Sequence, residues 1–156
     1  LDLLEYLNLE NTFVKWPNDI LVGKRKIAGI LTQNKLLSET IKSTVIGIGL
    51  NINQSKFTTF KREATSVKNE KITNSSLSEI SDRLLEFMEF RFTKSDNENW
   101  KDYFEKLYLK DKVAPFEIKG KKQMGIIRKV NKTGELVLET EDSIRNFQMK
   151  EIEFLI

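Results

Sequence analysis

The chain of 156 residues contains no cysteine and no histidine. Thiolate nucleophiles, imidazole bases, disulfides and the usual cysteine and histidine ligands of zinc are therefore excluded. No apolar run approaches the ~20 residues that a membrane helix needs, and no secretory leader is visible. These absences leave cations, carboxylates and carboxamides as the groups available for chemistry. They favour a reaction in which the protein positions its substrates and stabilises charge, such as phosphoryl or adenylyl transfer.

Composition is otherwise that of an ordinary globular protein. Lys and Arg number 26 against 23 Asp and Glu, which gives a formal net charge of +3. The length is sufficient for one domain and a small additional module. Without cysteine, the sequence is compatible with a reducing compartment, and we expect a cytoplasmic protein with no membrane partner.

The most informative residues lie between Phe13 and Asn53. The expected order is a Trp-Pro-Asn-Asp turn, a strand, a tight turn and a returning strand, at residues 16–19, 20–22, 23–24 and 26–32. A second strand, Thr44–Leu50, is β-branched or apolar except for two glycines. Glycines in a strand leave room for a close approach to the backbone. The two strands therefore predict a flat ligand lying on a sheet, with Lys26 at its edge to stabilise negative charge.

The segments KWPND (15–19), RKIAGIL (25–31) and IGIGLNIN (46–53) resemble, in this order, the catalytic domain of biotin protein ligases. The resemblance implies that biotin and ATP give biotinyl-AMP and pyrophosphate, with Mg²⁺ as the metal. The acyl group then passes to a lysine of a biotin carboxyl carrier protein, as in acetyl-CoA carboxylase.

The resemblance also implies roles for particular residues. Lys26 matches the lysine that contacts the biotin carboxylate and the phosphate, and is expected to be catalytic. Asn18 and Asp19 match the pair near the nucleotide and metal; Asp19 is a second catalytic candidate and the magnesium candidate. Asn51 matches the asparagine at the adenylate end. The strand floor under biotin corresponds to Gly29, Gly47 and Gly49.

Two departures from the family pattern stand out. The Ser-Thr-Asn segment and the Gly-Arg-Gly-Arg loop that covers the adenylate in this family are not in the sequence. The chain also begins at Leu1 without methionine, so we interpret it as the carboxyl-terminal part of a longer enzyme that is expected to be inactive alone. The second departure is Gln33, which stands where an acidic residue is expected and affects a local contact.

The rest of the chain is expected to be structural. A helix end, a long loop and two amphipathic helices are predicted at residues 1–9, 54–75, 76–91 and 97–109. Short strands are then predicted at residues 113–118, 122–130, 136–139 and 144–154. They resemble the SH3-like barrel of bacterial ligases. The predicted fold is α+β, a mixed sheet with helices followed by this barrel, with domains at residues 1–109 and 110–156.

Other interpretations exist for the same features. Taken singly, the Trp-Pro-Asn-Asp segment is a plain turn, Lys26 a solvated edge-strand charge, and the glycines packing accommodations. The basic segment 110–132 could contact nucleic acid, but it holds a single aromatic, Phe116, and so offers no stacking platform. A non-catalytic binding or assembly module of the same fold is the main alternative. Homodimerisation through a sheet edge is left open.

Overall fold

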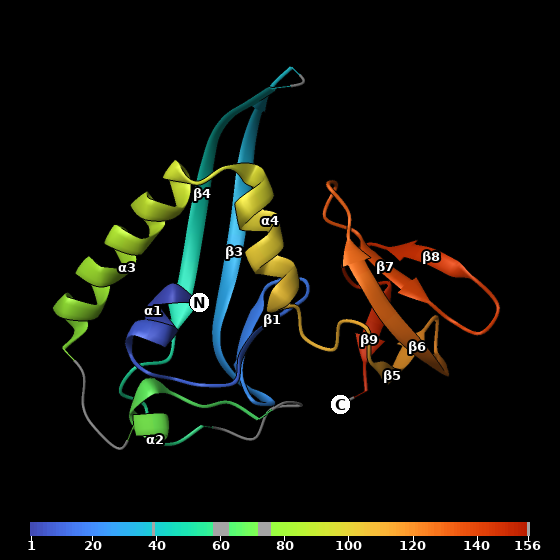
Figure 1. The fold of residues 1–156 in the computed structure, drawn as a ribbon, viewed down its shortest axis with the longest axis horizontal. Coiled ribbons are helices and arrows are strands. Elements are labelled where there is room, and N and C mark those ends of the chain that lie inside the picture. Colours follow the sequence, from blue (N-terminus) through green and yellow to red (C-terminus); the bar gives the residue numbers. More distant parts are fainter. Residues whose placement is uncertain (39, 58–62, 72–75, 156) are drawn as a thin grey trace. The chain divides into compact units, whose positions relative to one another are not determined.

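The computed structural model describes residues 1–38, 40–57, 63–71 and 76–155. The chain divides into two compact units, Leu1–Trp100 and Lys101–Ile156 (Figure 1).

The first unit is built on a four-stranded sheet with the order β1-β2-β3-β4. Its strands are β1 (Thr12–Lys15), β2 (Asp19–Val22), β3 (Arg25–Leu37) and β4 (Thr40–Leu50). The four pair antiparallel throughout, where the sequence predicts a mixed sheet. Parallel pairing is found at an isolated bridge between Lys26 and Ala64. The turn between β2 and β3 falls at Gly23, whose φ of 59° is a conformation that glycine adopts without strain.

One face of this sheet forms the core of the unit. Its buried residues come from the amino-terminal segment, from β2 and β3, and from a short helix further along the chain: Leu4, Leu9, Ile20, Val22, Ile27, Ala28 and Val67. On the other face Leu21 is also buried, while Asp19 and Gly29 are partly exposed and available for a site.

Two helices pack together beside the end of β4. They are α1 (Asp2–Tyr6) and α3 (Leu77–Thr93). Ser76, the first residue of the helix predicted over 76–91, caps α3 by accepting a hydrogen bond from the Glu79 backbone N–H in a Ser-x-x-Glu pattern. Ile80 is buried on the apolar face expected for α3, whereas Leu77 is exposed. Leu77 stands in the first turn of the helix, outside the cluster that Leu3, Ile52 and Ile80 form.

The segment 54–75, predicted to be a long loop, contains the short helix α2 (Val67–Lys71). Residues 58–62 and 72–75 of this segment lie outside the described part of the chain. Just before α2, Thr65 and Ser66 are almost completely buried. This order arises from hydrogen bonds to β3 and to the residues after β4, which the sequence pattern does not reveal.

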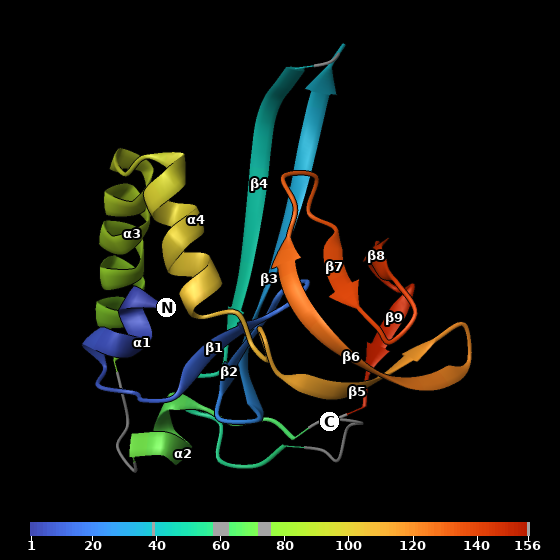
Figure 2. The same ribbon diagram turned by 45° about the vertical axis from the view of Figure 1, so that its right-hand side comes forward.

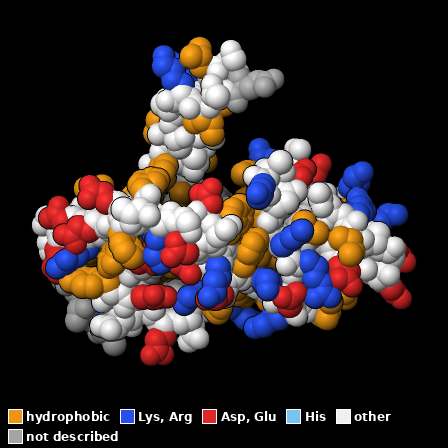
Figure 3. All heavy atoms as spheres, turned by 45° about the horizontal axis from the view of Figure 1, so that its top comes forward, with side chains coloured by type: hydrophobic (Ala, Val, Ile, Leu, Met, Phe, Trp, Pro, Cys, Tyr) orange, Lys and Arg blue, Asp and Glu red, His pale blue; other side chains and the backbone are white. Residues whose placement is uncertain are grey.

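Strands β3 and β4 are longer than the sequence predicts and form an arm. Beyond Leu31 the hairpin extends away from the helices and the other strands of its unit (Figures 1 and 2). Apolar side chains on the arm are exposed, as Figure 3 shows, and the large ones are Leu31, Leu36, Leu37, Ile41, Val45 and Ile46. Gln33 also lies on this arm, paired with Val45 and exposed.

The second unit contains a five-stranded antiparallel sheet with the order β8-β7-β6-β5-β9. Its strands are β5 (Val113–Ile118), β6 (Lys121–Val130), β7 (Leu136–Glu139), β8 (Ile144–Phe147) and β9 (Ile152–Phe154). Strands β8 and β9 are the outer strands of this order, so a closed SH3-like barrel is not confirmed in the described residues.

Two predicted elements of the carboxyl-terminal half differ from those observed. The single strand expected over residues 144–154 is divided into β8 and β9 by a turn. In that turn Lys150 has a φ of 74°, and the Glu151 N–H bonds to the Gln148 carbonyl. The helix expected over residues 97–109 is α4 (Asp96–Glu105), and the boundary between the two units falls within it. In the described ranges no helix is both long and apolar enough to cross a membrane.

Candidate functional site

A row of small residues crosses the exposed face of the first sheet. Asp19 on β2 pairs with Gly29 on β3, and Gly29 pairs with Gly49 on β4. Directly paired residues in an antiparallel sheet point to the same face. The next row on this face pairs Leu31 with Gly47. The three predicted glycines therefore lie together as a floor without side chains, bordered by Asp19 on one side and by Leu31 further along β3.

A β-bulge brings Lys26 to this floor. Along β3 the pairing with β2 passes from Ala28 opposite Ile20 to Lys26 opposite Leu21, so that Ile27 is the additional residue. With strict alternation, Lys26 would point to the face opposite Gly29, because the two residues are three positions apart. The bulge reverses this direction. Ile27 then lies in the core with no exposed surface, while Lys26 remains partly exposed on the floor side.

Lys26 and Asp19 form an ion pair over Gly29. The Lys26 Nζ lies 2.5 Å from the Asp19 Oδ1, with side-chain exposures of 41% and 14%. A Cβ atom built on Gly29 would lie 3.2 Å from the same Nζ, which shows how close the ammonium is to the floor. An ammonium has three N–H donors, so its pairing with Asp19 leaves donors for a ligand carboxylate or phosphate.

The backbone of Lys26 is held on the side away from β2. Strand β4 ends at Leu50, opposite Ala28, and residues 63–65 take its place beside Lys26. The Lys26 N–H donates to the Glu63 carbonyl at 2.9 Å, and the Lys26 carbonyl accepts from the Thr65 N–H at 2.8 Å. These bonds fix the position from which the Lys26 side chain extends.

Asn51 reaches the same segment. Its backbone N–H donates to the Ile27 carbonyl at 2.9 Å, and its side-chain Nδ2 donates to the Thr65 carbonyl at 3.0 Å. The side-chain oxygen of Asn51 is an acceptor on the same amide group. Asn18, in the turn before β2, uses its backbone carbonyl to accept from the Ile30 N–H at 2.8 Å.

The geometry thus brings the residues predicted from the sequence into one region. Lys26, Asp19, Gly29, Gly47 and Gly49 share one face, Asn18 is next to Asp19, and Asn51 reaches Lys26 through Thr65. Trp16, at the start of the Trp-Pro-Asn-Asp turn, is 4% exposed. Sequence reasoning missed Arg25, Thr65 and Glu70 as residues that contact one another near Lys26. Arg25 and Glu70 are 45 positions apart, and no local pattern joins them.

As a chemical arrangement, the site offers the Lys26 ammonium, the Asp19 carboxylate and a bare floor. The ammonium can neutralise an anion, and the carboxylate can bind a cation or accept a proton. Among the described residues there is no group of three or more Asp, Glu, His or Cys side chains that could hold a metal alone. The arrangement suits a substrate that brings its own negative charge to Lys26.

Comparisons of the sequence and of the structure with known proteins point to the same family. Residues 4–51 match the model of the biotin/lipoate A/B protein ligase family. The bifunctional ligase/repressor BirA of Bacillus subtilis (strain 168) is 49% identical over 43 residues, which are 28% of this chain and 13% of BirA. The chain therefore spans a small part of this curated relative. The residues that the family model matches, 4–51, contain the ion pair and the floor.

Solved structures extend the likeness beyond the matched segment. The apo structure of biotin protein ligase from Aquifex aeolicus has a TM-score of 0.76 at 20% identity, and covers 97% of this chain and 68% of that chain. The Aquifex aeolicus enzyme in complex with biotin and ATP has a TM-score of 0.70 at 22% identity, with coverages of 97% and 65%. At these identities the likeness establishes the fold.

Proposed function

We propose that the chain is part of a biotin protein ligase, starting from the match of residues 4–51 to the model of the biotin/lipoate A/B protein ligase family. The proposed reaction joins biotin and ATP into biotinyl-AMP and pyrophosphate. It then transfers the biotinyl group to a lysine of a biotin carboxyl carrier protein. The observation that supports this most is the Lys26 ammonium, which the bulge directs to the glycine floor beside Asp19.

In the first step, an oxygen of the biotin carboxylate forms a bond to the α-phosphorus of ATP, and pyrophosphate leaves. Negative charge increases on the phosphate oxygens in the transition state. Lys26 can stabilise this charge because its Nζ lies at the edge of the floor where the carboxylate would rest. A fixed cation that needs little rearrangement during the reaction is a strong catalytic contributor.

In the second step, the amine of the carrier lysine attacks the carbonyl carbon of biotinyl-AMP, and AMP leaves as an amide bond forms. The amine must lose a proton to become nucleophilic. Asp19 borders the floor, since it pairs with Gly29, and we assign to it either the orientation of this amine or the binding of a metal. Its ion pair with Lys26 gives it a further role, because it fixes the direction of the ammonium.

The nucleotide and metal contacts form another part of the proposal. Asn18 and Asn51 are assigned to adenosine hydrogen bonds, for which Asn51 has its side-chain oxygen. Mg²⁺ takes one or two carboxylates together with waters and phosphate oxygens, so Asp19 and the phosphates of ATP form a suitable set. When bound, Mg²⁺ would neutralise phosphate charge, while Lys26 and the floor position the biotin carboxylate.

The remaining assignments concern the whole protein. We propose domains at residues 1–109 and 110–156, the second an SH3-like module, and a cytoplasmic location. The longer ligase is proposed to supply the arginine-rich loop that closes over the adenylate, and this chain alone to have little activity because no such loop excludes water. Pairing between two copies through the free edge of β4 would give a homodimer.

The test is calorimetric binding of biotinyl-AMP, or a non-hydrolysable analogue, to this chain and to a longer chain that carries the Ser-Thr-Asn segment and the arginine-rich loop. We expect the longer chain to bind tightly. Lys26→Ala in that chain should reduce adenylate formation by about 3 kcal/mol or more, roughly 100-fold, because it removes a charge stabiliser.

Lys24→Ala is the matched control, since Lys24 is an exposed lysine in the turn two residues earlier. It should leave both binding and adenylate formation unchanged. Binding by neither chain would reject the ligase assignment and favour a non-catalytic module of the same fold. Normal turnover by Lys26→Ala would make Lys26 a surface lysine.

A further inference from the structure

The segment that holds Lys26 and Asn51 is itself fixed by three side chains, Arg25, Thr65 and Glu70, here called the Glu70 clamp. We propose that Glu70 is a positioning residue that sets the place of Lys26 and Asn51 through Thr65. This inference rests on the proposed function, because Lys26 and Asn51 are the residues assigned there to biotinyl-AMP.

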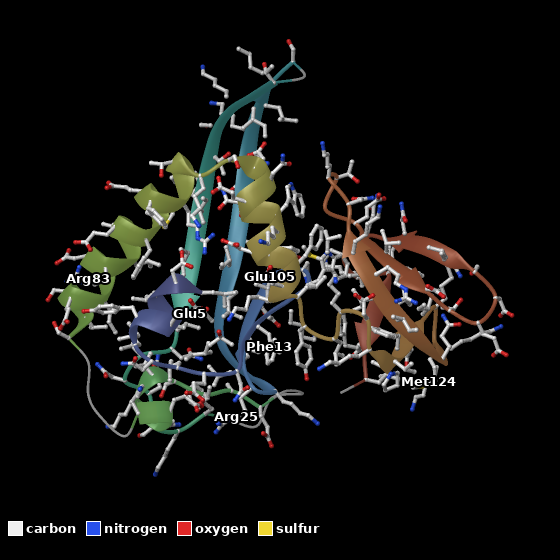
Figure 4. All side chains as sticks on the ribbon, in the orientation of Figure 1. Glu5, Phe13, Arg25, Arg83, Glu105 and Met124 are labelled. Carbon is white, nitrogen blue, oxygen red and sulfur yellow. The ribbon has the colours of Figure 1, made fainter. Side chains whose placement is uncertain are left out.

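The clamp has Glu70 at its centre. The Arg25 Nη2 lies 3.0 Å from the Glu70 carboxylate, and the Thr65 hydroxyl donates a hydrogen bond to the Glu70 Oε1. The Glu70 side chain is 12% exposed, whereas that of Arg25 is 46% exposed. A carboxylate that has lost most of its water needs such partners, because an unpaired buried charge is costly. Figure 4 labels Arg25 at the start of β3.

Thr65 transmits this restraint to both functional residues. Its N–H donates to the Lys26 carbonyl at 2.8 Å, and its carbonyl accepts from the Asn51 Nδ2 at 3.0 Å. The residue is 1% exposed. One buried threonine therefore contacts Lys26 and Asn51 with its backbone and Glu70 with its side chain, so a displacement of Thr65 would move both contacts.

The position of Lys26 makes such a restraint necessary. Lys26 lies beside the bulge and beyond the last β3–β4 pair, so the regular ladder does not hold it on that side. Its neighbours there are residues 63–65, which belong to no strand or helix. Helix α2 anchors the following residues, since the Val67 N–H donates to the Asn51 carbonyl at 3.0 Å. Glu70 lies in α2 and thereby ties the helix to Arg25 on β3.

The experiment compares two variants with a matched control. Glu70→Gln removes the charge that pairs with Arg25, and Thr65→Val removes the hydroxyl while keeping the size of a buried side chain. Glu86→Gln is the control, because it breaks an exposed arginine–glutamate pair of 2.7 Å on α3 by the same substitution. Amide hydrogen exchange of Lys26 and Thr65 is measured by NMR on the chain, with the amides of β2 as the internal reference.

We expect amide exchange at Lys26 and Thr65 to accelerate about tenfold relative to the amides of β2 in both variants. Losing a buried hydrogen bond lowers the free energy needed to open the backbone locally. The same two substitutions, placed in a chain that binds biotinyl-AMP, should lower its affinity for biotinyl-AMP by a similar factor. Glu86→Gln should change neither. Unchanged exchange in Thr65→Val, the variant that keeps the charge of Glu70, would overturn the clamp. Faster exchange with unchanged affinity would make it a structural link and overturn the positioning role.

Failure of the proposed function has a different signature. If native chains do not bind biotinyl-AMP while exchange at Lys26 and Thr65 accelerates in both variants, the restraint on Lys26 stands and the ligase assignment is wrong. If native chains bind and the variants match Glu86→Gln in exchange and affinity, the ligase assignment stands and the clamp is wrong.

Discussion

Gly29 has no side chain, and the charged end of Lys26 lies within a few ångströms of the space that a side chain there would fill. The Lys26 ammonium lies where a Cβ at this position would contact it, at 3.2 Å from Nζ and 3.3 Å from Cε. Gly29 is not in a left-handed conformation, so the backbone does not require a glycine there. Its value lies in the space that it leaves for the lysine and for a ligand.

We therefore expect the Gly29→Ala variant to fold. In a chain that binds biotinyl-AMP, the substitution should weaken binding at least about tenfold relative to the unsubstituted chain. The new methyl group displaces the end of Lys26, which is flexible, so the cost to stability is small. Calorimetry for binding and thermal unfolding for stability separate the two effects.

Gly47→Ala is the comparison, because its Cβ would have an ordinary contact of 3.7 Å with the Leu31 carbonyl and would not touch Lys26. If both variants lose affinity equally, the floor alone matters to the ligand and the position of the ammonium does not. An affinity loss confined to Gly29→Ala supports a close contact between Lys26 and the ligand.

The residues of the site differ in how far the sequence could predict them. Lys26, Asp19 and the glycines stand within one short stretch whose spacing is itself the signal, and the structure places them on one face. The bulge at Ile27 has no marker in a run of ordinary strand residues. Glu70 approaches Arg25 only after the intervening strands have folded, so residue types alone could not reveal the clamp.

At the scale of elements, α1 and α3 are joined by an ion pair between Asp2 and Arg91, in which both guanidinium nitrogens Nε and Nη2 donate to the carboxylate. This hydrogen bonding holds the pKa of Asp2 below its ordinary value of 3.8, and the Arg91 charge acts in the same direction. Protonating Asp2 would remove the pair. The two helices are also in contact through the rings of Tyr6 and Phe87, whose centroids are 6.0 Å apart.

Because the folded pKa of Asp2 is depressed, its contribution to stability is complete above the unfolded value of 3.8 and is lost as pH falls through the folded pKa. We expect Asp2→Asn to lower the free energy of unfolding at pH 7 by about 1 kcal/mol or less, since solvent screens a partly exposed pair. The difference from the native chain should shrink below about pH 4. Urea unfolding at pH 7, 4 and 3 measures it, and a difference independent of pH would assign the effect to lost packing.

The predicted helix and strand limits agree with the structure where the local sequence signal is strong. The Ser76 cap and the limits of β5 and β7 follow from capping and from alternation within a few residues. The arm exceeded its prediction because Gln33, Asn34 and Lys35 interrupt the apolar pattern while remaining in the β3–β4 ladder. Pairing across two strands, which a single sequence pattern does not report, sustains the arm.

At the scale of the whole molecule, we expect that each of the two units can be destabilised without the other. A Cβ on Gly125 in β6 would lie 2.9 Å from Leu138 Cδ2 and 3.2 Å from the Glu139 carbonyl, and Leu138 has no exposed surface. Gly125→Ala should thus lower the free energy of unfolding of the second unit by about 1–3 kcal/mol, the usual cost of overpacking.

Spectroscopy can follow the units separately, because both tryptophans, Trp16 and Trp100, belong to the first unit. In urea, the methyl signals of Leu138 should shift their midpoint in Gly125→Ala while tryptophan fluorescence keeps its own. A joint shift of both probes would mean that the chain unfolds as one cooperative body, contrary to the proposed division into domains.

The bulge at Ile27 also restricts how this chain can vary in length. Lys26 and Gly29 are three positions apart and share a face because Ile27 is an additional residue, so inserting one more residue between them while keeping the bulge would turn the ammonium into the apolar core. The turn at Gly23 and Lys24 lies outside the segment from Lys26 to Gly29, so we expect it to accept a change in length more readily. In descendants of this sequence, spacing should therefore be more strictly inherited than the identity of the residues that fill it.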